Sequence, residues 1–168
     1  MNRTKLQHAV SCALILGAVL VVKFLLTVSD NNGFFAFAVI FLAVFVPYLV
    51  YRFQKKYRDT ELGGAISYVD ALTYGIVLYA AAAVILGMVQ FIYYRYINPD
   101  FLAEQFRLGI EQLQIFGMPQ NIIDEAIKIG VPSPAASVFS EFVIHCFWGL
   151  LMALVTSAIV KKTKENEQ

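Results

Sequence analysis

The run SEFVIHCFWGLLMALVTSAIV, residues 140–160, decides the class of fold. A helix of about 20 apolar residues is long enough to cross the hydrocarbon core of a bilayer. This run also carries Glu141 and His145, four residues apart and therefore on one face of a helix. Ionisable residues inside a membrane are rare, and they face the interior of a helix bundle or a functional pathway. The run therefore predicts a membrane span. Whether Glu141 and His145 have a structural role inside the bundle or line a functional pathway stays open.

The composition of the whole chain supports a membrane protein. Of its 168 residues 59% are hydrophobic and 15% are charged, and the mean hydropathy is +0.66. Soluble domains average about 45–50% apolar and about 25% charged residues. A chain of this length cannot bury such an excess in one core, so its surface must be apolar and face lipid. Cys12 and Cys146 both lie in hydrophobic runs and do not form a disulfide framework.

Four runs are long and apolar enough to span a membrane: residues 9–28, 34–51, 71–94 and 135–160. A cleaved secretory signal is the alternative for the first run. Its apolar stretch is too long for a signal, and no small-residue cleavage site follows it. The predicted fold is all-α: a four-helix transmembrane bundle that forms a single membrane domain over residues 1–168.

The distribution of Lys and Arg predicts the orientation. If there are four spans, nine of the 13 basic residues lie on one side of the membrane, three on the other and Lys23 inside the first span. The nine are Arg3, Lys5, Arg52, Lys55, Lys56, Arg58, Lys161, Lys162 and Lys164, and the three are Arg95, Arg107 and Lys128. Because basic residues concentrate on the cytoplasmic side, both termini are predicted to be cytoplasmic.

The segment between the second and third spans contains a glycine pair and a helix start. Gly63 and Gly64 could suggest a phosphate-binding loop, but no Gly-Lys-Ser or Gly-Lys-Thr follows them, and no strand precedes them. A turn with positive φ is the simpler interpretation. Ser67 and Asp70 fit a capping box that opens the third helix. The basic residues before the turn indicate an ordinary cytoplasmic anchor, with lipid-headgroup binding as the weaker alternative.

Residues 98–130 predict an amphipathic helical hairpin outside the membrane, between the third and fourth spans. Asn98 is expected to cap its first helix, with Pro99 in the first turn and Asp100 close behind. The apolar arc of that helix comprises Leu102, Phe106, Gly109, Ile110, Leu113 and Phe116. Because the hairpin is net acidic, we expect it to pack on the outer end of the bundle rather than on an anionic lipid surface. A partner protein, or a ligand cavity under a lid, remains an alternative.

Several stretches of the chain carry a resemblance to a known family. They are YRDTELGGAISYVDALTYG, YYRYINPDFLAEQ, GMPQNIIDEAI and SPAAS, before a last helix that ends in lysines. Together they resemble the bacterial four-span inner-membrane proteins catalogued as domain of unknown function 4199. The residues that fit its motifs are Arg58, Asp59, Gly63, Gly64, Ile66, Ser67, Tyr68, Asn98, Pro99, Asp100 and Phe101. Pro119 and Gln120 stand where the family tends to have serine and acidic residues. The resemblance implies this topology and a bacterial inner-membrane location, and it implies no activity.

No enzyme signature stands out in the sequence. The only histidines are His8 and His145, and the patterns HExxH, CxxC and GxSxG do not occur. A metal site needs more ligands than Glu141 and His145 supply. We therefore predict a protein without catalysis, cofactor, metal or nucleic-acid partner. The leading function is an accessory, scaffolding or oligomer-forming subunit in the lipid bilayer, and the alternative is a small transporter or ion-coupled carrier.

Small and polar residues recur every four positions in the last two spans. In the fourth span they are Glu141, His145, Gly149, Ala153 and Ser157, and in the third they are Gly75, Tyr79, Ala83 and Gly87. In lipid, small residues permit close approach of two helices, and polar residues point inward. The two rows favour a packing seam over a transport pathway.

Lys23, Glu141 and His145 are predicted to form an intramembrane polar cluster. Lys23 lies about 7.5 Å below the outer end of the first span, and Glu141 about 9 Å below the same side. We expect the two charges to face each other, with His145 beside them. The alternative is that Lys23 extends unpaired to the outer interface. In the carrier hypothesis these three residues line the path.

The orientation can be tested by labelling. Single cysteines in place of Glu111 and Lys56, in a background that lacks Cys12 and Cys146, are treated with an impermeant maleimide on intact cells. We expect labelling at 111, in the outer hairpin, and none at 56, in the cytoplasmic segment. Labelling at 56 alone would reverse the orientation.

Overall fold

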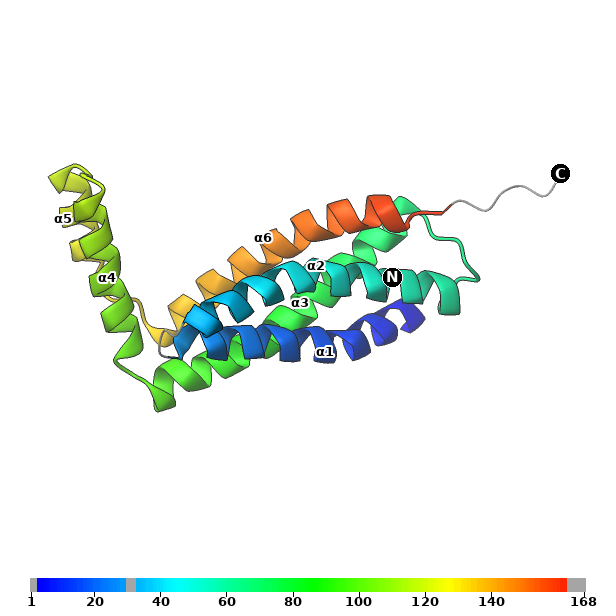
Figure 1. Ribbon diagram of the computed structural model, residues 1–168, viewed down its shortest axis with the longest axis horizontal. Helices are drawn as coiled ribbons and strands as arrows, with labels where there is room; N and C mark the ends of the chain where they lie inside the picture. The colour runs from blue at the N-terminus through cyan, green and yellow to red at the C-terminus, as the bar shows by residue number, and fades with distance from the viewer. Residues whose placement is uncertain (1–2, 30–32, 163–168) are drawn as a thin grey trace. The chain divides into compact units, whose positions relative to one another are not determined.

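The computed structural model describes residues 3–29 and 33–162, with the backbone alone at 33–36, so Lys164 lies outside it. Its helices are α1 (Arg3–Val28), α2 (Gly33–Glu61), α3 (Tyr68–Ile92), the π-helical turn η1 (Tyr93–Ile97), α4 (Phe101–Ile115), α5 (Gln120–Ile129) and α6 (Pro134–Val160) (Figure 1). The predicted all-α fold is confirmed.

Four of these helical segments are long and apolar enough to cross a membrane. They are Arg3–Val28, Phe37–Glu61, Tyr68–Ile97 and Pro134–Val160. Each overlaps one of the four predicted spans. The chain is therefore a helical membrane protein, in which much of the apolar surface is left for lipid.

The second helix is longer than the sequence predicted. Its predicted end was residue 51, whereas α2 continues through the charged stretch to Glu61. The extension is helical because it buries one face: Gln54 is 0% and Tyr57 2% exposed, while Lys55 and Lys56 between them are exposed. Residues 52–61, which were predicted to lie in a loop, thus form the last turns of α2.

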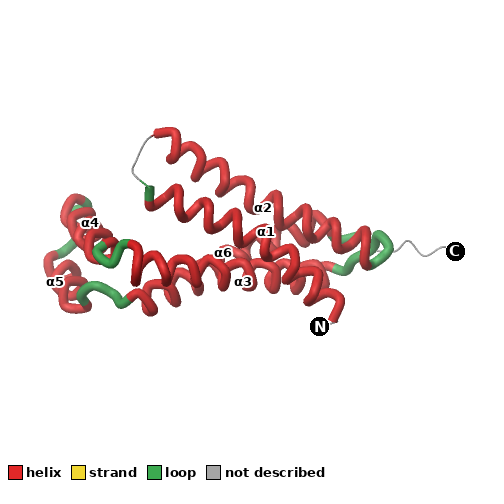
Figure 2. The backbone as a smooth tube through the Cα atoms, turned by 90° about the horizontal axis from the view of Figure 1, so that it is seen from below, coloured by secondary structure: helices red, strands yellow, loops and turns green. Residues whose placement is uncertain are grey.

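Contacts within the chain group into two compact units. Unit 1 is Met1–Leu86 with Phe142–Gln168, and unit 2 is Gly87–Glu141. In unit 1, α1 and α2 lie side by side (Figure 2). Its fully buried core side chains include Leu16, Val50, Tyr74 and Leu78. That residues 1–168 form a single domain stays a prediction.

The predicted seam between the last two spans is confirmed where glycines meet larger neighbours. A Cβ atom added at Gly149 of α6 would lie 2.5 Å from the ring of Tyr79 on α3. One added at Gly75 would lie 2.9 Å from the Cβ of Ala153. These distances are too short for real contacts, so the helices approach this closely only because the residues are glycines.

In unit 2, the π turn η1 changes how the next helix starts. The backbone N–H of Asn98 donates to the carbonyl of Tyr93 at 2.8 Å and closes that turn. The prediction that Asn98 caps the hairpin's first helix is wrong. The position before α4 is Asp100, whose side chain makes no capping bond, and α4 begins at Phe101.

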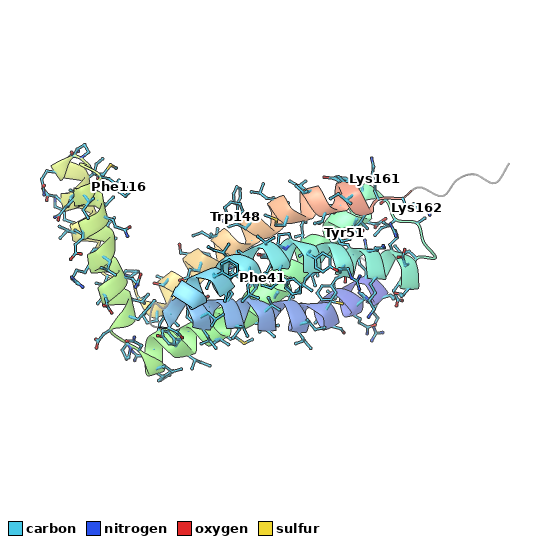
Figure 3. The ribbon with its side chains drawn as sticks, viewed as in Figure 1. Phe41, Tyr51, Phe116, Trp148, Lys161 and Lys162 are labelled. Carbon is cyan, nitrogen blue, oxygen red and sulfur yellow. The ribbon has the colours of Figure 1, made fainter. Side chains whose placement is uncertain are left out.

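The two short helices of unit 2 are joined by a glycine turn. Gly117 has φ +68, and the bonds from Gly117 N to Gln114 O and from Met118 N to Leu113 O form a Schellman motif. α4 and α5 contact each other, and Ile123 is buried at 2% exposure. Phe116, at the end of α4 (Figure 3), is 80% exposed. That the two apolar faces pack on the spanning bundle stays a prediction.

The seam gives a matched pair of glycine substitutions. Gly149→Ala should destabilise the protein in detergent by about 1–3 kcal/mol, because its methyl group overlaps the Tyr79 ring. Gly109→Ala, in α4, has no atom within 4 Å of the added Cβ and should stabilise its helix by about 0.5–1 kcal/mol. Thermal unfolding in one detergent measures both. Equal effects would mean that the α3–α6 approach is looser than described.

Candidate functional site

The residues of the first family motif, from Arg58 to Tyr68, lie where α2 ends and α3 begins, in unit 1. There they make a set of bonds that we call the polar clasp. Its members are Lys5, Gln54, Arg58, Ile66, Ser67, Asp70, Ser157, Val160 and Lys162. They come from all four long helices and the segments next to them, so the clasp fixes how these helices meet at this end.

Arg58 joins α2 to the last turn of α6. Its guanidinium donates to the carbonyl of Val160 at 3.0 Å and to the carboxylate of Asp59 at 2.7 Å. The last carbonyls of a helix have no partner within the helix, so a cationic donor there satisfies one of them. Beyond the predicted glycine turn, Ile66 and Lys162 exchange two backbone hydrogen bonds of 2.9 and 3.0 Å.

The start of α3 is tied to α1. Ser67 Oγ accepts the backbone N–H of Asp70 at 3.1 Å, as the predicted capping box requires. The return bond differs from that motif, because the Ser67 hydroxyl itself donates to the Asp70 carboxylate at 2.8 Å. The other oxygen of Asp70 binds the Lys5 ammonium at 2.5 Å, and the Lys5 side chain is only 10% exposed. A charge-assisted bond thus fixes α1 against α3.

Gln54 is a clasp residue that the sequence did not single out. Its amide donates to the carbonyl of Ala71 on α3 and to the hydroxyl of Ser157 on α6, both at 3.0 Å. Gln54 is 0% exposed. The charged residues around Gln54 led to the prediction of a loop. In the structure the stretch is part of α2, and Gln54 lies on the inner face of that helix.

An aromatic cluster adjoins the clasp. The rings of Tyr57 and Tyr74 stack with centroids 4.8 Å apart, and the Tyr74 hydroxyl lies 2.8 Å from Nδ1 of His8. His8 also contacts the Tyr57 ring. Among the residues that the structure describes, no group of three His, Cys, Asp or Glu side chains could hold a metal ion. The polar groups at this end join helices to one another.

Glu141 is held by two residues of unit 2. The amide of Gln90 donates to one carboxylate oxygen, and the hydroxyl of Tyr94 donates to the other at 2.9 Å. Gln90 and Tyr94 are each 3% exposed, and the Tyr94 ring stacks on Phe101 with centroids 5.6 Å apart. The carboxylate therefore links the start of α6 to the end of α3 and to η1. The sequence pattern singled out Glu141 but not its partner Gln90.

Lys23 and His145 line a common cavity in unit 1, whereas Glu141 belongs to unit 2. The cavity has a volume of about 220 Å³, and Tyr79 and Trp148 also line it. The structure thus places two members of the predicted cluster around one space. The pairing of Lys23 with Glu141 stays a prediction.

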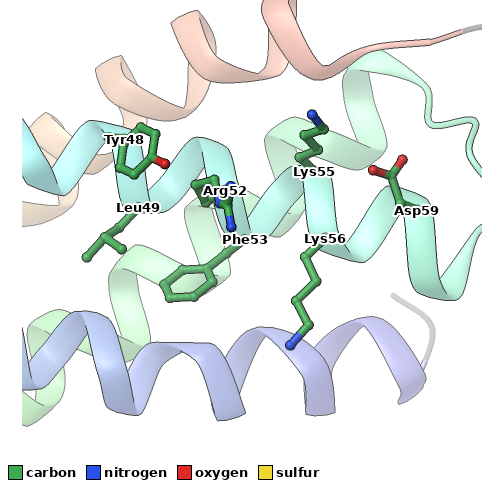
Figure 4. Close-up of a pocket in the computed structure, with 7 residues that line it drawn as sticks. All are labelled: Tyr48, Leu49, Arg52, Phe53, Lys55, Lys56 and Asp59. Carbon is green, nitrogen blue, oxygen red and sulfur yellow. The ribbon is translucent and has the colours of Figure 1, made fainter.

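A larger, basic hollow of about 530 Å³ follows α2 (Figure 4). Arg52, Lys55 and Lys56 line it with Tyr48, and the Arg52 guanidinium lies 6.0 Å from the Tyr48 ring centroid. In Figure 4, Lys56 extends toward α1 and Lys55 extends away from it. Because the cations do not converge on one point, the hollow suits a diffuse membrane anchor better than a specific ligand.

Comparison with known proteins identifies the family. The sequence model of a family described as "Protein of unknown function (DUF4199)" matches residues 11–162. The chain belongs to this family. No curated protein and no solved structure matches it. In this DUF4199 protein, the motif residues from Arg58 to Ser67 build the clasp and its turn, and the second motif, Asn98 to Phe101, forms the turn between η1 and α4.

The Glu141 site predicts a measurable coupling. Tyr94→Phe and Glu141→Leu each remove the bond between these side chains, so their effects on unfolding in detergent should not add. A double-mutant cycle should give a coupling of about 0.5–3 kcal/mol. Tyr96→Phe is the control, because Tyr96 lies in the same turn and is 72% exposed. Additive effects for Tyr94 and Glu141 would mean that the bond contributes nothing to stability.

Proposed function

We propose that this DUF4199 protein is a non-enzymatic subunit of the bacterial inner membrane. Both termini are cytoplasmic, and the α4–α5 hairpin presents an apolar surface outside the membrane to another membrane protein. The observation that carries the proposal is the exposure of large apolar side chains at the tip of this hairpin.

The hairpin tip is unusually apolar for a surface outside the spans. At the turn between α4 and α5, Ile115 is 82% exposed and Phe116 is 80% exposed; Ile129, at the other end of α5, is also 80% exposed. Met118, Ile122 and Ile127 are exposed nearby, at 40 to 51%. Monomeric proteins rarely leave such side chains grouped together, and exposed apolar patches mark interaction sites.

The charge of the hairpin favours a protein partner over lipid. The charged residues of α4 and α5 are Glu104, Arg107, Glu111, Asp124, Glu125 and Lys128. With four acidic and two basic groups, this surface is repelled by anionic headgroups. It suits an apolar partner surface with basic residues around it.

The rest of the molecule supports a structural role. Arg58, Gln54, Asp70 and Glu141 are each engaged in bonds between helices. Side chains committed in this way position helices and do not act on a substrate.

Photo-crosslinking in native membranes tests the proposal. A benzophenone amino acid at Phe116 should yield one discrete adduct with another membrane protein, and the same group at Glu104, on the polar face, should not. The captured protein, once purified, should bind the wild-type chain and bind Phe116→Asp at least about tenfold more weakly. Because Phe116 is 80% exposed, this substitution should leave the fold intact. Adducts with lipid alone, or equal capture from both positions, would overturn the proposal.

A small carrier is the second candidate, favoured by the cavity that Lys23 and His145 line. Transport requires water access to those side chains, whereas a scaffold requires none. Folded Lys23→Met or Glu141→Gln variants that change proton or ion leak in liposomes would favour the carrier. Unchanged leak would favour the scaffold.

A further inference from the structure

We propose that the cavity lined by α1, α2, α3 and α6 in unit 1 binds a small aliphatic carboxylate, with Lys23 as the counter-ion of its carboxylate group. This binding site is separate from the partner surface of the hairpin. The site requires neither catalysis nor transport. A negative result for it would therefore leave the proposed function unaffected, and the reverse also holds.

The size and lining of the cavity indicate a small amphiphile. Its volume of about 220 Å³ lies below the roughly 300–1,000 Å³ typical of sites for drug-sized ligands. Leu20, Val46 and Met152 make part of the wall apolar, while Lys23 and His145 supply polar groups. A short hydrocarbon chain matches the apolar part of the wall, and an anionic group matches the polar groups of Lys23 and His145.

The charge balance of unit 1 calls for an anion near Lys23. The acidic side chains that the structure describes in this unit are Asp59, Glu61 and Asp70, all near the polar clasp. Asp70 binds Lys5, which precedes Lys23 by 18 positions in the sequence, or about 27 Å along α1. Asp59 binds Arg58. An ammonium group inside an apolar span is costly, and a bound carboxylate offsets that cost.

The polar groups around the cavity are mainly donors. The Lys23 ammonium and the indole N–H of Trp148 donate and do not accept. Tyr79, which is 6% exposed, adds a hydroxyl that can donate as well as accept. A carboxylate offers only acceptors, so it complements this set. A neutral alcohol of the same length would leave the ammonium without a counter-charge.

Trp148 is the only tryptophan of the chain, and it makes the site directly observable. Purified protein in a neutral detergent is titrated with sodium hexanoate, with hexan-1-ol and with sodium chloride, while Trp148 fluorescence is recorded. We expect a saturable change with hexanoate alone. A second titration uses dodecanoate, which partitions into the micelle. Comparing its affinity with that of hexanoate distinguishes a membrane-borne acid from a water-soluble one. Tight binding of hexanoate or of dodecanoate supports the carboxylate site.

Matched variants assign the binding to the cavity. Lys23→Met should weaken hexanoate binding about tenfold or more, because it removes a charge-assisted bond. Lys128→Met, in α5, should leave binding unchanged. Tyr79→Phe keeps the ring that packs on Gly149, so it should fold normally and bind hexanoate more weakly. Thermal unfolding checks that each variant is folded.

Three results would overturn the inference. The first is an equal response to hexan-1-ol, which would mean that the cavity takes only an apolar chain. The second is unchanged binding by folded Lys23→Met. The third is hexanoate binding by Glu141→Gln and none by the wild type, which would mean that Glu141 is already the counter-ion of Lys23.

Discussion

A membrane interior offers a protein no hydrogen-bond partner, and this constraint decides where the polar side chains of the chain lie. A polar group carried into the spans is costly unless it finds a partner within the protein. Gln54 bonds to α3 and α6, Glu141 is held by Gln90 and Tyr94, and the last carbonyl of α6 accepts a bond from Arg58. Polar residues in such a bundle specify which helices meet, while small residues such as Gly149 let them approach closely.

The family motif acquires a physical meaning from these contacts. Its glycines reverse the chain between α2 and α3, and its serine caps α3. Arg58 fastens α6, and Asp70, just beyond the motif, fastens α1. A short stretch between two spans therefore joins all four long helices at one end of unit 1.

The features that the sequence predicted are those set by local rules. Four apolar runs become four long helices, the glycine pair has positive φ, and Ser67 accepts the N–H of Asp70, because each depends on residues a few positions apart. The bonds that escaped prediction join distant segments: Gln54 and Ser157 are 103 positions apart, and Arg58 and Val160 are 102. Neither a periodicity nor a motif specifies such a partner. The cavity of Lys23 and His145 is likewise visible only once four helices are packed.

The central claim, that the motif closes the bundle, is tested most directly by comparing two arginines of α2. Arg58→Gln removes the bonds to Val160 and Asp59, and Arg52→Gln makes the same change at an exposed position of the same helix. Unfolding in detergent should show a loss of about 1–3 kcal/mol for Arg58→Gln and a change within about 0.5 kcal/mol for Arg52→Gln. Equal stabilities for the two variants would contradict the claim, and the motif would then require a role other than holding the helices together.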